Sequence, residues 1–227
     1  MQRETAGRLP WMPDWSRIDT VLLDMDGTVL DLHFDNHFWT EHLPKRWAES
    51  RGMAPAAARD ELMAMITRVA GTLDFYCLDY WRARLGLDLV ALKREIADGI
   101  RMLPHARRFL EALRASGRRS VLVTDCHRDA LTLKLERTGL ADLVDAVYCS
   151  HDHGLPKEDD AFWRALRRAE PFDPARTLLL DDNLRVLDAA RRYGIAWTVA
   201  VRCPDSRAAP RDTGGRPAVD DLAAIMP

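Results

Sequence analysis

The sequence predicts an α/β protein with a parallel sheet, helices on both of its faces, and an all-helical subdomain inserted near the start. Short apolar runs rich in valine and leucine recur along the chain, and helical patterns separate the later runs. Such continuous runs suit strands that are buried on both faces, as in a parallel sheet. Alternating strands and helices are typical of the α/β class.

Five apolar runs are predicted to be strands: 20–23, 120–123, 177–180 and 197–201, with a weaker run at 146–149. The helical patterns near the later runs cover 104–116, 128–139, 158–169 and 185–193. Three glycines follow three of these helices, where left-handed C-caps are common: Gly117, Gly139 and Gly194. After a Pro/Gly-rich stretch, we expect a short last helix over 218–226.

The stretch from 33 to 100 has no convincing strand. Its helical patterns lie near 36–50, 55–70, 72–85 and 88–98. A βαβ crossover needs only one helix, so four helices between two strands indicate an inserted subdomain. We therefore expect a core formed by residues 16–32 and 101–227 and a helical cap over 33–100. Most of the cap's tryptophans are expected in its own core.

Composition narrows the function. The 227 residues include 33 Lys+Arg and 35 Asp+Glu, a net charge of -2, which disfavours a nucleic acid polymer as partner. No apolar run approaches the ~20 residues of a membrane helix, and the first 15 residues carry charges and prolines where a signal peptide needs an apolar stretch. The four cysteines form no CxxC pair, so reduced thiols and a cytoplasmic location are expected.

Polar residues follow the predicted strands, where ligands gather in open α/β sheets. They are Asp24, Asp26, Thr124, Asp125, Asp181 and Asp182, joined by Lys157 from the loop after the weak strand. Carboxylates this close together repel one another unless a cation lies between them. Oxygen ligands are those that Mg²⁺ prefers, so the sequence predicts a magnesium site that attracts a phosphate.

The motifs DMDGT at 24–28, Thr124, Lys157 and Asp181-Asp182 resemble, in order and spacing, those of the haloacid dehalogenase (HAD) superfamily of phosphohydrolases. The helical insertion resembles the C1-type cap of that superfamily, and the likeness covers about residues 16–227. The segments LLDMDGTVLDLHFDNHFW, YCLDYW, LKLERTGL, GLPKED and CPDS look like its GMP/IMP 5'-nucleotidase branch. The resemblance implies a Rossmann-like HAD core.

The resemblance also implies a role for each core residue. Asp24 would be the nucleophile that forms an aspartyl-phosphate. Asp26 would protonate the leaving oxygen and then deprotonate the attacking water. Mg²⁺ would bind a carboxylate oxygen of Asp24, the main-chain carbonyl of Asp26 and the carboxylate of Asp182. Asp181 would bind it directly or through a water.

The remaining groups around the phosphate follow the family less closely. Thr124 and Lys157 would stabilise charge on the phosphoryl oxygens. Relatives more often carry Asn where this chain has Asp125, and often Gly or Asp where it has Val186. The nearest acid to that second position is Asp188, which at helical spacing is expected to cap a helix or form an ion pair.

Substrate choice is expected to depend on the cap. A purine nucleoside 5'-monophosphate would stack on aromatic faces and hydrogen-bond to polar side chains. The candidates are His33, Phe34, Asn36, Phe38, Trp39, Tyr76, Asp79, Tyr80 and Trp81. Phosphatases for phosphoglycolate or sugar phosphates remain an alternative, as does a β-phosphoglucomutase-like phosphotransferase. Asp26 argues against a C–halogen hydrolase, and the intact acid pair argues against a non-catalytic module.

One further cluster, His151-Asp152-His153, suggests a metal site at first sight. No other soft ligand has a spacing that suits zinc, so the run is interpreted as a substrate-side loop or, in preference, as simple surface. Cys126, the cysteine nearest to the motifs, is expected to be a small buried hydrophobic residue.

Overall fold

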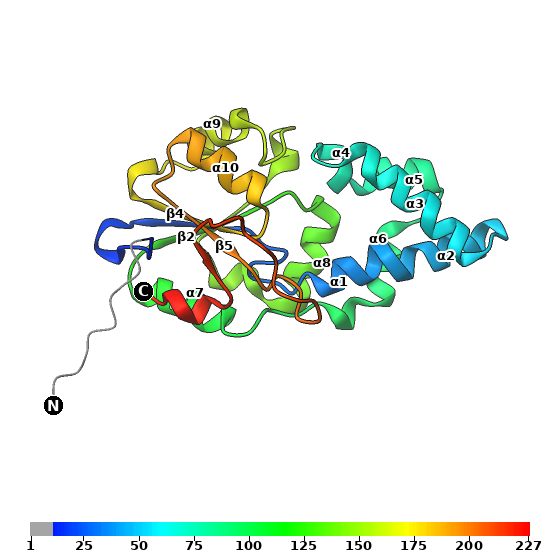
Figure 1. The fold of residues 1–227 in the computed structure, drawn as a ribbon, viewed down its shortest axis with the longest axis horizontal. Helices are drawn as coiled ribbons and strands as arrows, with labels where there is room; N and C mark the ends of the chain where they lie inside the picture. The colour runs from blue at the N-terminus through cyan, green and yellow to red at the C-terminus, as the bar shows by residue number, and fades with distance from the viewer. Residues whose placement is uncertain (1–10) are drawn as a thin grey trace.

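A computed structural model describes residues 11–227; the first ten residues, which belong to the segment that argues against a signal peptide, lie outside that range. Six parallel strands form one sheet in the order β3-β2-β1-β4-β5-β6 (Figure 1). They are β1 Thr20–Leu23, β2 Arg119–Thr124, β3 Ala146–Cys149, β4 Thr177–Asp181, β5 Trp197–Val201 and β6 Ala218–Val219. The five predicted strands are confirmed.

Helices cover both faces of this sheet. Successive side chains of a strand point to opposite sides, so a strand that is apolar at every position presents an apolar surface on each face. Val21 and Leu23 pack in one apolar cluster with α7 (Ala106–Ala115) and α8 (Arg128–Thr138). Leu22 lies in a second cluster with α9 (Asp160–Ala169) and α10 (Leu184–Tyr193). All three strand residues are completely buried, so the continuous apolar run reflects burial on both faces.

Between β1 and α7 the chain forms the helical insertion, residues 33–99, which contains helices and no strand along its fully described length. Its helices are α1 His33–His37, η2 Phe38–His42, α2 Leu43–Arg51, α3 Pro55–Val69, α4 Leu73–Tyr76, α5 Leu78–Leu85, α6 Leu89–Glu95 and η3 Ala97–Gly99. Figure 1 shows α2 to α6 as a lobe beside the sheet. The lobe has its own apolar core, which includes Trp47 and Trp81.

Two local predictions are wrong. Residues 218–226 do not form a helix: β6 takes the first two, and a short 3₁₀ turn, η7, spans Leu222–Ile225. Backbone pairing with β5 prevails there over the helical pattern. The pattern at 72–85 is broken at Cys77, whose extended backbone separates α4 from α5. Among the described residues, no helix is both long and apolar enough to cross a bilayer.

Candidate active site

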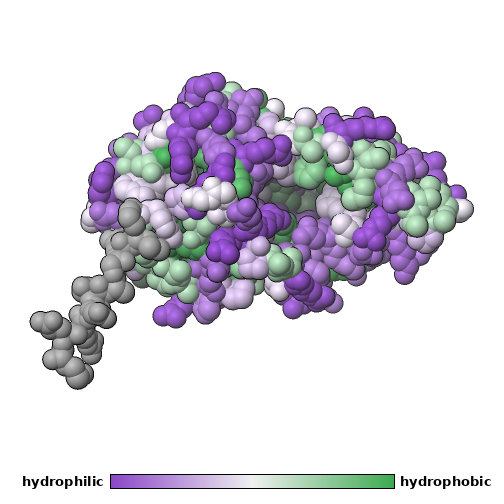
Figure 2. Space-filling model, in the orientation of Figure 1, coloured by the Kyte–Doolittle hydropathy of each residue, from purple (hydrophilic) through white to green (hydrophobic). Residues whose placement is uncertain are grey.

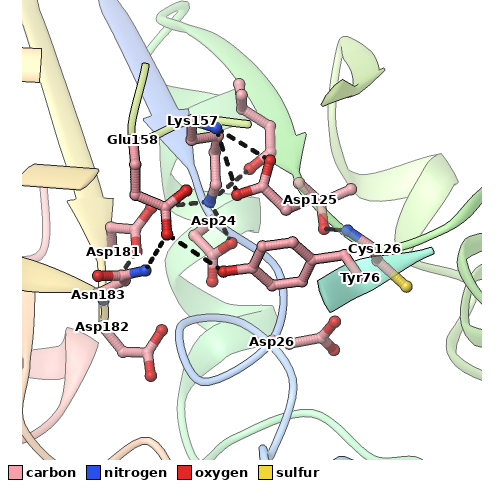
Figure 3. Close-up of polar contacts among 12 residues, drawn as sticks. Asp24, Asp26, Tyr76, Asp125, Cys126, Lys157, Glu158, Asp181, Asp182 and Asn183 are labelled. Atoms are coloured by element: carbon pink, nitrogen blue, oxygen red, sulfur yellow. Dashed lines mark hydrogen bonds and ion pairs between the residues drawn. The ribbon is translucent and has the colours of Figure 1, made fainter. Parts of the chain in front are cut away.

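The carboxyl edge of the sheet holds Asp24 beside a buried lysine (Figure 3). Asp24 directly follows β1, and its main-chain N–H donates to the carbonyl of Leu180 on β4 (2.9 Å). Lys157 Nζ donates to Asp24 Oδ1 (2.6 Å) and to Asp181 Oδ2 (2.8 Å). The lysine side chain is only 3% exposed. Lys157 therefore ties the ends of two adjacent strands together.

Asp24, Asp181 and Asp182 can bring one carboxylate oxygen each to within 4.8 Å of one another. Gly27 permits this approach: a Cβ at that position would lie 2.7 Å from Asp182 Cγ, and its φ of +93° also favours glycine. Asp24 Oδ2 is buried and has no hydrogen-bond partner within residues 11–227. The three carboxylates form a donor set that suits Mg²⁺, and one oxygen of Asp24 is not used by other protein groups within residues 11–227.

The electrostatics of this carboxylate cluster favour a bound cation. Burial, reinforced by repulsion from Asp181, raises the pKa of Asp24 to about 8, although Lys157 opposes the shift. Burial also raises the pKa of Asp181 and of Asp182 to about 7. Arg211 donates to Asp182 Oδ2 (2.6 Å) and opposes that rise. Burial is the largest cause of all three shifts and repulsion between neighbouring carboxylates adds to it, so a bound cation would favour the ionised forms.

Asp26 points away from Asp181 and Asp182 (Figure 3) and belongs to a second buried charge network. Lys134 of α8 contacts Asp26 Oδ2 (2.7 Å) and Asp35 Oδ2 (2.6 Å). Lys93 of α6 contacts the other oxygen of Asp35 (2.7 Å). Burial raises the pKa of Asp26 against the opposing effect of Lys134. The sequence interpretation missed Asp35, Lys93 and Lys134.

One of those three residues, Lys134, left a signal in the sequence. Lys134 lies among apolar residues of the α8 pattern, between Leu133 and Leu135, yet its side chain is only 2% exposed. A lysine at such a position is rarely buried without a charge partner. Burial would raise the pKa of Asp35, but Lys134 and Lys93 hold it below its ordinary range. The network therefore keeps Asp35 ionised.

Thr124 and Asp125 follow the prediction in position. Thr124, the last residue of β2, is buried, and its hydroxyl accepts from the N–H of Cys126 (3.0 Å). Asp125, the departure from the family's usual Asn, accepts the main-chain N–H of Lys157 through Oδ1 (3.1 Å). Burial raises the pKa of Asp125 to about 6 despite Lys157. Its carboxylate thus supports the Lys157 loop.

The second departure has an equally local explanation. Val186 is buried in the apolar cluster beneath α10. Asp188 forms an ion pair with Arg216 (2.7 Å), one of the two roles expected for it. Neither residue replaces a carboxylate of the site.

A cavity of about 520 Å³ lies between the sheet edge and the helical insertion, and Figure 2 shows the surface hollowed between the two lobes. Asp24, Asp26, Lys157, Asp181 and Asp182 line it from the core. From the insertion it is lined by Asn36, Trp39, Phe75, Tyr76 and Lys93. The carboxylates and lysine of the strand ends and the aromatic and amide side chains of the insertion therefore face one space.

The other specificity candidates lie elsewhere. Of the described residues, neither His33 nor Tyr80 lines this cavity. His33 Nδ1 lies 3.2 Å from Asp205 Oδ1, and Asn36 Nδ2 donates to Asp205 Oδ2 (2.7 Å). The Tyr80 ring packs under the guanidinium of Arg84. Asp205, from the CPDS segment, thus anchors the start of the insertion. The aromatic candidates Phe34, Phe38 and Trp81 are buried in apolar clusters.

Tyr76 connects the insertion to the core above the site. Its hydroxyl donates to Glu158 Oε1 (3.4 Å), which also accepts from Asn183 Nδ2 (3.0 Å). Burial raises the pKa of Tyr76, so the phenol stays protonated. The Tyr76 ring lines the cavity and lies beside Asp24 (Figure 3).

An α/β sheet with clustered carboxylates, a buried lysine and a covering cavity is an arrangement typical of enzymes whose site lies at the strand ends. The family model for haloacid dehalogenase-like hydrolases matches residues 18–194. The chain belongs to this family and is a phosphatase of it.

Similar proteins agree with this assignment. The chain is 40% identical, over 94% of its length and 96% of the relative's, to the GMP/IMP nucleotidase YrfG of Escherichia coli. Its fold matches the HAD phosphatase of Thermococcus onnurineus with a TM-score of 0.76 at 21% identity, covering 92% and 96% of the two chains. A β-phosphoglucomutase-like protein of Thermotoga maritima matches at 0.66, with 18% identity and coverage of 92% and 97%.

Proposed function

We propose that this phosphatase hydrolyses purine nucleoside 5'-monophosphates such as GMP and IMP, with Mg²⁺ and through an aspartyl-phosphate. The observation that carries the proposal is the single cavity in which Asp24 and its carboxylate partners face an aromatic and amide wall formed by Asn36, Trp39 and Tyr76. The nucleotidase named among its relatives supports the same substrate class.

In this proposal Asp24 attacks the phosphorus. Its Oδ2 is the free oxygen, because Oδ1 is held by Lys157. Lys157 and Thr124 neutralise charge that develops on the phosphoryl oxygens. Asp24, Asp181 and Asp182 would hold Mg²⁺, with the main-chain carbonyl of Asp26 as a further ligand. When bound, the metal screens the negative charges and aligns the phosphate.

Asp26 moves the protons. Burial raises the pKa of Asp26, which favours the protonated form that can give a proton to the ribose 5'-oxygen. The resulting carboxylate then accepts a proton from the water that cleaves the aspartyl-phosphate. Lys134, 2.7 Å from Oδ2, orients the carboxyl and leaves Oδ1 without a partner within residues 11–227. Oδ1 is therefore the oxygen available to the substrate.

The wall formed by the insertion would recognise the base. The Trp39 indole lines the cavity and packs edge-on against Trp81 (5.5 Å between ring centroids), which fixes its plane. Aromatic rings held in this way stack well on purines. Asn36 lines the same wall, although its amide nitrogen is bound to Asp205. The oxygen of its side-chain amide, Oδ1, is the group left to accept a hydrogen bond from a base.

The test is a phosphate-release screen with Mg²⁺ over GMP, IMP, other nucleotides, phosphoglycolate and sugar phosphates. We expect the highest kcat/KM for GMP or IMP, and no turnover by Asp24→Asn on any substrate. A clear preference for phosphoglycolate or a sugar phosphate would contradict the nucleotide assignment while leaving the phosphatase assignment intact.

The role of Asp26 is tested with two leaving groups. Asp26→Asn should lose more activity on a nucleotide than on nitrophenyl phosphate, because a nitrophenolate departs without a proton. Since Asp26 is also the base of the second step, the rescue is partial. Equal losses on both substrates, with hydrolysis of the aspartyl-phosphate shown not to limit either, would contradict the acid role.

A further inference from the structure

We propose that Cys77, His127 and His151 form a second metal site, for a borderline or soft divalent cation such as Zn²⁺, which fastens the helical insertion to the core. One potential ligand atom from each residue lies within 4.8 Å of the other two. The site is chemically distinct from the Asp24, Asp181 and Asp182 cluster, because it offers sulfur and nitrogen rather than carboxylate oxygen.

The fold brings these three residues together from separate segments. Cys77 stands between α4 and α5 of the insertion, where the extended backbone interrupts the helix. His127 precedes α8 in the loop after β2. His151 lies in η5 (Ser150–Asp152), directly after β3. Because β2 and β3 are neighbouring parallel strands, their following loops adjoin, and the insertion brings the thiol to them.

The potential ligand atoms are available. Cys77 is a free thiol. His151 Nε2 is buried and has no hydrogen-bond partner within the described part of the chain. The His151 ring also hydrogen-bonds to the main chain of Asp125. A ring nitrogen that donates to a carbonyl leaves the other nitrogen with a free lone pair, the usual arrangement in metal-ligating histidines.

His127 supplies the second imidazole. Its side chain is 12% exposed, and its ring meets that of His151 edge-on, with 5.1 Å between centroids. Its Nε2 lies 3.5 Å from Asp79 Oδ2. Two imidazoles and one thiolate are the donors that zinc prefers over magnesium. A water would complete the fourth position.

The proposal differs from the sequence interpretation of His151. That interpretation rejected a metal site because no soft ligand had a suitable spacing along the chain, whereas folding brings Cys77 and His127 into range.

The proposed metal site also adjoins the substrate cavity. Tyr76, directly before Cys77, lines that cavity and contacts Glu158 of the core. A metal at Cys77 would thus hold this wall of the cavity closed over Asp24 and slow substrate exchange.

The test uses Co²⁺ as a spectroscopic substitute for Zn²⁺, with the complete chain in excess Mg²⁺ so that the carboxylate cluster is occupied. We expect one equivalent of Co²⁺ to produce a thiolate-to-cobalt charge-transfer band in the near ultraviolet. Cys77→Ser should abolish it. Cys203→Ser, which removes another free, half-buried thiol, should retain it. Excess Zn²⁺ should displace Co²⁺ and the band together.

The histidine ligands are tested by affinity. His151→Gln should weaken Zn²⁺ binding, measured by competition with a chromophoric chelator, by at least roughly 100-fold, the upper range for losing an outer-shell partner. Zn²⁺ should raise the melting temperature of the wild type but not of Cys77→Ser or His151→Gln. A band that persists in Cys77→Ser, its absence from the wild type, or unchanged Zn²⁺ affinity in His151→Gln would overturn the proposal.

Discussion

Replacing Lys134 by Met tests whether the buried charge network controls the proposed acid, Asp26. Lys134 Nζ bridges Asp26 (2.7 Å) and Asp35 (2.6 Å), while Lys93 holds the other oxygen of Asp35 (2.7 Å). Two lysines thus balance two aspartates. The thioether has a similar length and no charge, so Lys134→Met removes one cation and leaves a buried carboxylate in excess.

The expected magnitude follows from the burial. The Lys134 side chain is 2% exposed and those of Asp26 and Asp35 are 19% and 16% exposed. Removing one partner of a buried ion pair costs about 3–5 kcal/mol, so the free energy of unfolding should fall by about that amount. An opposite charge this close lowers a carboxyl pKa by about 1–3 units. Its loss should raise the pKa of Asp26 by the same amount.

The sign of the kinetic effect follows from the proposed role. Asp26 must be protonated to release the alcohol, so a higher pKa extends the protonated form to higher pH. In a plot of kcat/KM for GMP against pH, the fall on the alkaline side (the alkaline limb) should therefore move to higher pH by about 1–3 units in Lys134→Met. With nitrophenyl phosphate, whose leaving group needs no proton, that limb should not move.

The control is Lys93→Met, which removes the other lysine of the network but not the contact with Asp26. It should lose comparable stability in urea unfolding and show a much smaller shift of the alkaline limb. An unchanged limb in folded Lys134→Met, or equal shifts in both variants, would refute the reasoning.

Three further outcomes are expected. Asp24→Asn should fold, lose turnover, and be more stable than the wild type in EDTA at pH 8, because it removes a buried charge; urea unfolding measures this. In EDTA the melting temperature of the wild type should fall as the pH rises from 5 to 8. The raised pKa values of Asp24, Asp181 and Asp182 make the folded state bind protons more tightly than the unfolded chain does. A rise in melting temperature would contradict this, and Mg²⁺ should restore most of the loss at pH 8. Trp39→Ala should lower kcat/KM for GMP by roughly 5- to 150-fold, the range for one lost stacking contact. Tyr80 does not line the cavity, so Tyr80→Ala should change kcat/KM little. A larger loss in Tyr80→Ala than in Trp39→Ala would contradict base recognition by Trp39.

Much of the sheet and of its reactive edge could be predicted from the sequence because both depend on local signals. A run such as Val21-Leu22-Leu23, apolar at every position, indicates a strand covered on both faces. The acidic residues at the ends of β1 and β4 then meet because neighbouring parallel strands end at the same edge. Asp24 and Asp181 required no knowledge of distant packing beyond strand order.

The remaining features depend on contacts between distant segments. Residues 218–219 pair with β5 only because the loop between them returns to the sheet edge, and a helical pattern over nine residues cannot show this. The sequence around Cys77 likewise does not indicate that His127 and His151 lie beside it in the fold. The sequence predicts His33 near the substrate because it lies close to Asp24 along the chain, whereas folding turns its ring toward Asp205.

The Asp35 network shows how the insertion and the chemistry are connected. Asp35 begins the insertion in α1, Lys93 ends it in α6, and Lys134 belongs to the core. Asp35 therefore shares its charge between a lysine of each part, and the core lysine is the one that contacts Asp26. If the insertion moved away from the core, Asp35 and Lys93 would move together, and Lys134 would be left to pair with Asp26 alone. The protonation of Asp26 is thus coupled to the position of the insertion through one shared carboxylate.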